Sequence, residues 1–151
     1  MRVFANLRAL FSRGTLHFNS LELRVLRETM RRLDPGSAKR MQRRMDQVNL
    51  VQRLEGGEEV NSYQMVGGRS IGPDSAALRS GSGESLLASF SVTCGRGERV
   101  AGRIWLVDGV LFSLEFDKPT EGLLDAESLT ISVELAPVDA ASEGAVAPSE
   151  T

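Results

Sequence analysis

His17 and Cys94 are the chain's only histidine and only cysteine, and the two residue types act together in many nucleophilic enzymes. Arg96 follows Cys94 closely, and a neighbouring cation is one requirement of a reactive thiol. No third group is placed to orient the histidine, however, and a lone thiol is more often packed in an interior. We therefore predict that Cys94 is structural and that the chain has no catalytic residues of this kind.

The carboxylate pair Glu115 and Asp117 is a second candidate for catalysis, because residues two apart on a strand share one face. A general acid and base need one carboxylate removed from water, whereas both are expected to point outward. The glycine-rich segments 67–75 and 95–102 lack the lysine of a phosphate-binding loop and the strand-to-helix context of a dinucleotide site. A single cysteine also excludes a cysteine cage. The sequence thus predicts no cofactor and no metal site.

The charges are divided unevenly along the chain. The net charge is only −2, but residues 1–54 contain 12 Lys or Arg against 4 Asp or Glu, and residues 55–151 contain 6 against 16. With 41% hydrophobic residues the chain is too apolar to be disordered. A basic first part joined to an acidic second part predicts either that the two parts pair with each other or that an acidic partner binds.

Residues 1–14 contain no acidic residue and three arginines, which interrupt any apolar run. This excludes an ordinary signal peptide, and no stretch of the sequence approaches the ~20 apolar residues that cross a bilayer. A targeting segment or a membrane-surface helix remains an alternative for residues 1–14. A single cysteine allows no internal disulfide, which agrees with a reducing compartment, and the expected location is the cytoplasm.

The strongest helix signals lie between residues 19 and 36. Asn19 is a favourable N-cap, and Glu22 is placed to complete a capping box with it. Pro35 and Gly36 are expected to end this helix. Its predicted buried stripe consists of Leu23, Leu26, Met30 and Leu33.

Two further helices complete the predicted helical part, residues 1–54. One covers residues 2–12, where four apolar residues share a face. The other begins with Ser37 as its cap and runs to about Leu54. Its apolar line is Met41, Met45, Val48 and Val51.

Between residues 60 and 135 the hydrophobic period changes to two, which predicts strands. The dipeptide Asp108-Gly109 is typical of a two-residue type I′ hairpin turn. Such a turn would pair Val107 with Val110 and Trp105 with Phe112, and Arg103 with Leu114 further along.

The predicted architecture is a single α+β domain, residues 1–135. Its N-terminal amphipathic helices pack on one face of an antiparallel β-meander of about 4–5 strands. Residues 67–85 are expected to form a flexible loop. Residues 136–151 are expected to form a disordered tail, because they are mostly small, acidic or proline residues.

The two faces of the predicted sheet differ in composition. We predict that the core face is the one that gathers aromatic and branched side chains, namely Trp105, Val107, Val110, Phe112, Leu114 and Phe116. The other face has Ser and Thr on its outer strands and an aliphatic centre of Leu87, Ile104, Leu106 and Leu111. An apolar patch with a polar rim is typical of an interaction surface, so we predict partner binding or self-association there. The alternative is that a loop or helix covers this patch.

Arginines recur at helical spacing away from the apolar stripes: Arg24, Arg27 and Arg31 in residues 20–33, and Arg40, Arg43 and Arg44 in residues 37–54. Clustered arginines can neutralise phosphates, so nucleic-acid binding through these helices is an alternative function. A solvated basic face is the simpler interpretation, because arginine forms helices well and no aromatic residue lies among these arginines to stack bases.

The sequence therefore predicts a non-catalytic cytoplasmic binding protein, of the adaptor, regulatory or immunity type by analogy of fold alone. It would hold a protein partner, or a second copy of itself, with the aliphatic sheet face or the basic helical face. Nucleic-acid binding is the alternative, and an enzyme with a site beneath the 67–85 loop is the third hypothesis.

Overall fold

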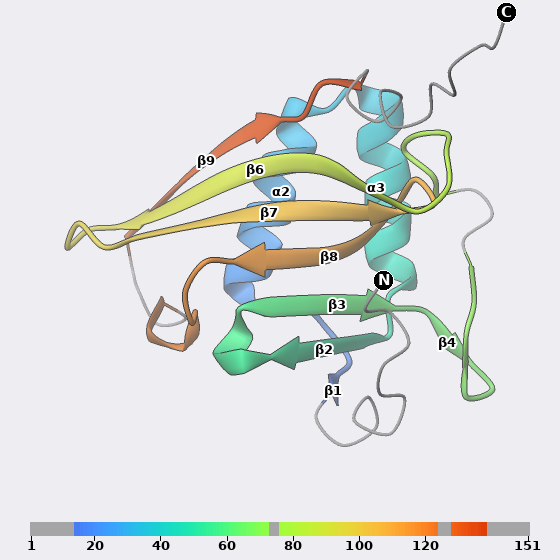
Figure 1. The fold of residues 1–151 in the computed structure, drawn as a ribbon, viewed down its shortest axis with the longest axis horizontal. Helices are drawn as coiled ribbons and strands as arrows, with labels where there is room; N and C mark the ends of the chain where they lie inside the picture. The colour runs from blue at the N-terminus through green and yellow to red at the C-terminus, as the bar shows by residue number, and fades with distance from the viewer. Residues whose placement is uncertain (1–13, 73–75, 124–127, 139–151) are drawn as a thin grey trace, which may run out of the picture.

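The computed structural model describes residues 14–72, 76–123 and 128–138, which form two helices packed against one face of an antiparallel sheet (Figure 1). The predicted α+β class is therefore confirmed. The predicted helix over residues 2–12 and the tail from residue 139 lie outside the described residues. The elements are α2 (Ser20–Arg32), α3 (Pro35–Gln47), β1 (Gly14–Thr15), β2 (Leu50–Leu54), β3 (Glu59–Tyr63), β4 (Met65–Val66), β5 (Arg69–Ser70), β6 (Glu84–Cys94), β7 (Arg99–Val107), β8 (Val110–Phe116) and β9 (Leu129–Leu135), with short 3-10 turns at Glu55–Gly57 and Glu121–Leu123.

Helix α2 begins at the predicted capping box. The side-chain oxygen of Asn19 accepts from the backbone N–H of Glu22 at 2.9 Å, and Glu22 Oε1 accepts from the N–H of Asn19 at 2.8 Å. Of the predicted stripe, Leu26 is fully buried and the other three residues pack partly buried against the core. Leu21 and Val25, which that prediction omitted, are also buried, so the inward face of α2 is wider than expected.

Helix α3 differs from its prediction at both ends. Its N-cap is Asp34 rather than Ser37, and Asp34 Oδ2 accepts from the N–H of Ser37 at 3.0 Å. Hydrogen bonding from the side chain and from the backbone N–H of Ser37 holds the pKa of Asp34 below its usual value. The helix ends at Gln47, and residues 50–54 form β2, so the predicted helix to Leu54 is wrong. Val51 misled the prediction because it is buried in a strand while also matching the helical period.

The main sheet has seven strands in the order β1-β2-β3-β8-β7-β6-β9, with every neighbouring pair antiparallel. It is therefore wider than the predicted meander. Strands β6, β7 and β8 follow one another as expected, whereas β9 returns to the far side of β6 and forms one edge. Both helices lie behind the sheet in Figure 1 and run across its strands.

The hairpin between β7 and β8 turns at Asp108 and Gly109, whose φ angles of 50° and 82° fit the predicted type I′ turn. Val107 pairs with Val110 as predicted, but Trp105 pairs with Ser113 and not with Phe112. Phe112 has no partner on β7, which makes it the extra residue of a β-bulge.

A second bulge lies on the other side of β7. Leu86 pairs with Trp105 and Ala88 with Ile104, so Leu87 is the extra residue of β6. An extra residue reverses the alternation of the side chains that follow it. Leu111 and Leu114 therefore both lie in the core, although simple alternation places them on opposite faces.

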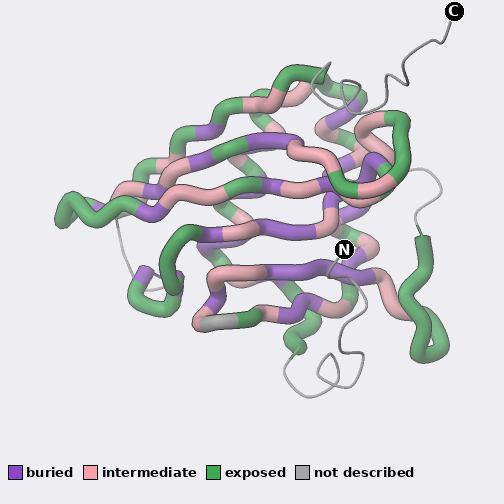
Figure 2. The backbone as a smooth tube through the Cα atoms, viewed as in Figure 1, coloured by how far each residue is buried: buried purple, intermediate pink, exposed green. Residues whose placement is uncertain are grey.

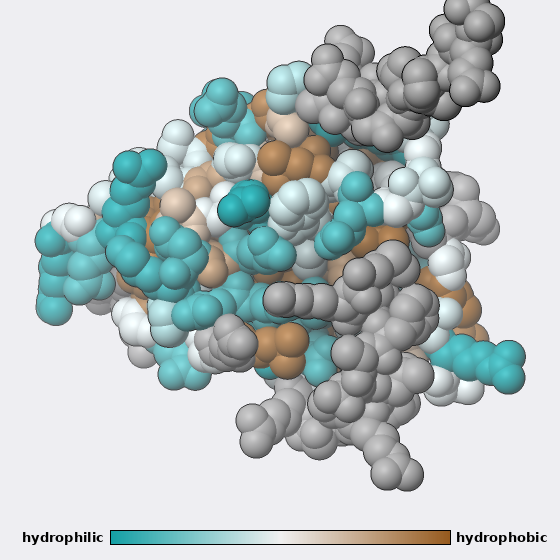
Figure 3. All heavy atoms as spheres, in the orientation of Figure 1, coloured by the Kyte–Doolittle hydropathy of each residue, from teal (hydrophilic) through white to brown (hydrophobic). Residues whose placement is uncertain are grey.

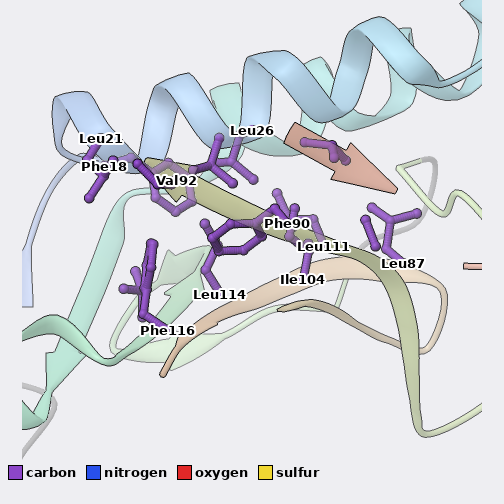
Figure 4. Close-up of a cluster of buried hydrophobic side chains, with 14 of the residues drawn as sticks. Phe18, Leu21, Leu26, Leu87, Phe90, Val92, Ile104, Leu111, Leu114 and Phe116 are labelled. Atoms are coloured by element: carbon purple, nitrogen blue, oxygen red, sulfur yellow. The ribbon is translucent and has the colours of Figure 1, made fainter. Parts of the chain in front are cut away.

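The core lies between the sheet and α2, where Leu26 points toward the layer that contains Phe90, Ile104 and Leu111 (Figure 4). Figure 2 shows buried residues concentrated in the central strands. Trp105, by contrast, is only half-buried. It lies on the opposite face by alternation with Ile104, so the predicted Trp105 core face is wrong for β7. Leu114 and Phe116 are in the core as predicted.

Gly102 lies between two aromatic residues of the core. It pairs with Phe90 on β6 and with Phe116 on β8, and the two rings meet edge to face with centroids 5.2 Å apart. A Cβ at position 102 would overlap the Phe90 ring and the backbone oxygen of Glu115. The absence of a side chain here lets the Phe90 ring cover the middle of β7.

The Glu22–Arg53 ion pair connects α2 to β2. Arg53 Nε donates to Glu22 Oε2 at 2.7 Å and Arg53 Nη2 donates to Glu22 Oε1 at 2.6 Å, and the glutamate is buried. Arg53 also donates to the hydroxyl of Thr15 and the backbone oxygen of His17. A buried carboxylate is stable because its charge and its lone pairs are both satisfied.

We predict that Gly102→Ala lowers the free energy of unfolding by about 3 kcal/mol, because the backbone oxygen it meets cannot move without distorting β8. Gly122→Ala is the matched control, since no atom lies within 4 Å of a Cβ at that position. Urea unfolding of both variants measures the difference. Equal stability of the two variants would contradict the assigned packing.

Candidate functional site

An open depression of about 530 Å³ lies on the face of the sheet opposite the helices. Its floor follows from the register, because Ser91 on β6 pairs with Ala101 on β7 and with Ser132 on β9. Three small side chains therefore lie side by side, and longer side chains surround them. These longer residues are Arg99, Arg103, Glu115, Asp117 and Glu134.

The charged residues of the depression alternate in sign across the strands. Arg103 on β7 has Glu115 on one side and Ser89 on the other, and Ser89 in turn pairs with Glu134. Among the described residues, the side chains of Arg99, Arg103, Glu115 and Glu134 make no hydrogen bond and no ion pair. Figure 3 shows hydrophilic side chains over the left and centre of this face.

Asp117 has a structural role at the rim of the depression. Its Oδ1 accepts from the backbone N–H of Ala101 at 3.0 Å, and its own N–H donates to the oxygen of Ala101. The predicted outward position of Glu115 and Asp117 agrees with their place around the depression. Asp117 extends the pairing of β7 and β8 past the end of β8, while the side chain of Glu115 has no hydrogen-bond partner among the described residues.

The depression offers hydrogen-bonding and charged groups. The surrounding residues offer three hydroxyls, two guanidinium groups and two unengaged carboxylates. They include no histidine, cysteine or lysine, so no serine has an imidazole or amine beside it to act as a base. Guanidinium and carboxylate groups of this kind hydrogen-bond the polar groups of another polypeptide.

The predicted interaction patch is not on the surface. Leu87, Ile104, Leu106 and Leu111 each have 0% relative exposure and belong to the core. The prediction of a binding surface at these four residues is therefore wrong. The four residues do share one face, as predicted, but that face is the core, because the bulges align Leu111 with Leu114 and Leu87 with Phe90.

Arg44 is also buried, although it was predicted to lie on a basic face. It has 5% relative exposure, and it donates from Nε to the oxygen of Leu111 at 3.0 Å and from Nη2 to the oxygen of Ser62 at 3.2 Å. Burial lowers the pKa of Arg44. Ser62 Oγ donates to the next backbone oxygen of β8, that of Phe112, at 2.8 Å. Arg44 and Ser62 thus supply donors to the carbonyl groups of the bulge.

The remaining predicted basic residues differ in their exposure and in their partners. Arg24, Arg27, Arg31 and Arg43 are exposed, whereas Arg40 is half-buried and donates to the hydroxyl of Ser37. Arg31 pairs with Glu28 at 3.1 Å, and Arg24 donates to the backbone oxygen of Leu129 at 3.1 Å. Four of the six predicted arginines are therefore exposed on the helical layer.

The histidine and the cysteine do not form a site. Cys94 is a buried member of the core, while His17 is exposed and its backbone oxygen accepts from Arg53. His17 borders a smaller hollow of about 270 Å³ between α2 and α3, together with Arg27, Gln42 and Asp46. Within residues 14–72, 76–123 and 128–138, no group of three or more His, Cys, Asp or Glu residues is arranged to hold a metal ion. In the same ranges no helix has the length and apolar character needed to cross a bilayer.

Comparisons of the chain with protein-family models, with curated proteins and with solved structures find no match. A function must therefore be argued from the geometry alone.

The depression was not predicted, although its elements are visible in the sequence. The alternating serines of β6 and β9 were recognised as the polar face, and that assignment agrees with their exposure. What was missed is that Ala101 lies between Arg99 and Arg103 at a spacing of two, so a small residue separates two long ones on one face. That spacing, placed beside Ser91, is the signal that would have found the hollow.

Replacing Arg44 tests the role assigned to it. Arg44→Met is expected to lower the free energy of unfolding by about 2 kcal/mol, because two buried carbonyl groups lose their donor. Lys39→Met, at an exposed position of the same helix, is the control and is expected to have little effect. Guanidinium unfolding measures both. A methionine variant as stable as the natural protein would show that desolvation of the guanidinium cancels its hydrogen bonds.

Proposed function

We propose that this protein is a non-catalytic binding protein that holds a partner protein on the outer face of its sheet. The observation that supports the proposal is the depression around Ser91, where charged groups from three strands engage no other described residue. Free guanidinium and carboxylate groups are strongly hydrated, and their alternating arrangement is complementary to a surface of opposite pattern.

The chemistry of the depression indicates what kind of partner it fits. Its walls are polar and its floor is made of small residues, so the interface would be wet and poor in apolar contact. Interfaces of this kind occur in transient complexes rather than in permanent ones. An adaptor or regulatory role, in which a partner binds and leaves, agrees with this chemistry. We expect it to take place in the cytoplasm, where a buried thiol such as Cys94 stays reduced.

Nucleic-acid binding through α2 and α3 has less support. Arg44 is buried and donates to backbone oxygens, Arg31 pairs with Glu28, and Arg24 donates to the backbone oxygen of Leu129. No aromatic residue occurs within α2 or α3 to stack bases beside the exposed arginines. Binding to duplex or single-stranded DNA that weakens steeply with salt would nevertheless favour this alternative.

Site-specific crosslinking tests the proposed surface. A photoreactive phenylalanine analogue at position 91 is expected to crosslink a partner in the native cell, because Ser91 is at the floor of the depression. The same analogue at position 39, on the exposed side of α3, is the matched control and is expected to capture none of that partner.

A charge reversal completes this test. Arg103→Glu, introduced together with the analogue at position 91, is expected to reduce the crosslinked partner about tenfold. The new carboxylate would join those of Glu115 and Glu134 around the depression and remove the complementary pattern of charge. Equal capture from positions 91 and 39, or capture that Arg103→Glu leaves unchanged, would contradict binding in the depression. Thermal unfolding of the variants confirms that the fold is retained.

A further inference from the structure

Strand β9 is an edge of the sheet. It pairs with β6 along its whole length and with no other strand of the described residues. At the opposite end of the sheet the edge is β1, which has only two residues. The seven residues of β9 therefore form the longer of the two edges.

The register shows which backbone groups of β9 point away from the sheet. The N–H of Ala136 donates to the oxygen of Leu87, and the N–H of Gly95 donates to the oxygen of Ser128. Because bonding alternates along an antiparallel pair, the even-numbered residues of β9 bond to β6. The N–H and C=O groups of Ile131, Val133 and Leu135 then point outward, and they make no hydrogen bond with any described residue.

This edge has few of the features that normally prevent a strand from being added, and Glu134 is the one charged residue of β9. The sequence of β9, LTISVEL, contains no proline and no lysine, and its pairing with β6 has no bulge. Ile131 and Val133 are β-branched, which favours the extended conformation. A continuous row of free donors and acceptors on a regular strand can pair with another extended segment.

The charges beside β9 indicate which kind of segment fits. Helix α2 packs against β9 behind the sheet (Figure 1), and Arg24 of α2 donates to the outward oxygen of Leu129. Arg31 is on the same face of α2, seven residues further on, and its side chain is 77% exposed. A segment added to β9 would thus lie beside the guanidinium group of Arg24, which favours a carboxylate in that segment, whereas Arg31 is already paired with Glu28.

A second copy of this chain fits the edge less well. Antiparallel pairing of two β9 strands about a two-fold axis would bring the two α2 helices next to each other. The exposed residues Arg24, Arg31 and Arg32 of one copy would then approach the same residues of the other. Repulsion between like charges opposes that arrangement.

We propose that the β9 edge binds an extended acidic peptide segment of a partner protein, which adds to the sheet as a further strand. Outward groups of Ile131, Val133 and Leu135 pair with its backbone. Its side chains on the helix side lie against the apolar edge of the core and beside Arg24, and its carboxylates belong on that side. Those on the other side lie beside Thr130, Ser132 and Glu134. This inference is independent of the proposed function, because the edge and the depression are altered by different substitutions.

Fluorescence anisotropy of the full chain with a labelled probe peptide tests the proposal. The probe is a nonapeptide in which valine alternates with glutamate, and the matched peptide has lysine in place of glutamate. The glutamate peptide is expected to bind about tenfold more tightly, as the loss of one charge-assisted hydrogen bond predicts. Arg24→Glu is expected to reverse this preference, while Ser91→Trp, which fills the depression, is expected to leave it unchanged.

Backbone methylation shows whether the probe binds as a strand. One peptide is N-methylated at its valines and another at its glutamates, so that one of them loses the donors that face β9. One of these two peptides is expected to lose binding and the other to retain it. In the protein, Ile131→Pro removes an outward N–H that has no partner, and is expected to abolish binding without changing the circular dichroism spectrum.

Three outcomes would overturn the proposal. They are equal binding of the glutamate and lysine peptides, binding that neither methylated peptide loses, and a dimer in sedimentation that Ile131→Pro dissociates. The last outcome would assign the edge to a second copy of the chain. Failure of these tests would leave the crosslinking result at position 91 unaffected, so the two proposals fail separately.

Discussion

The bulge at Phe112 is the constraint on which the rest of the structure depends. An extra residue in a central strand interrupts the ladder and leaves carbonyl groups without strand partners. Here the oxygen of Leu111 accepts from Arg44 of α3, and the oxygen of Phe112 accepts from Ser62 of β3. The bulge is thus stabilised from the helical layer and from a neighbouring strand together. Because it reverses the alternation within β8, it also decides that Leu114 and Phe116 face the same layer as Leu111.

Local signals in the sequence predicted much of the fold, and the capping box at Asn19, the turn at Asp108 and the polar face of β6 and β9 all agree with the structure. These features are set by residues close together in the chain. The assignment of faces failed because a bulge is a property of two strands and leaves no mark on the period of one. The prediction that Arg44 lies on an exposed basic face was also wrong, because its hydrogen-bond partners are 18 and 67 residues away in the sequence. Predicting the depression would have required the pairing register of three strands, β6, β7 and β9.

The two proposed surfaces share strand β9. Ser132 and Glu134 face the depression, while the backbone of the neighbouring residues points away from the sheet at the edge. A single extended segment could not use both at once through the same atoms, because the side chains and the backbone groups of a strand project in perpendicular directions. The structure therefore offers side-chain recognition on one face and backbone recognition at its border.

The position of β9 at the end of the described chain has a consequence for synthesis. Helix α2 is made more than ninety residues before β9, beside which it packs. Part of the apolar side of α2 stays exposed to solvent during synthesis until β9 emerges from the ribosome. Contacts between such distant segments slow folding, because a long loop closes before they form. A chain that stalls before Leu129 would expose both this helix and the unpaired side of β6, a combination that chaperones recognise.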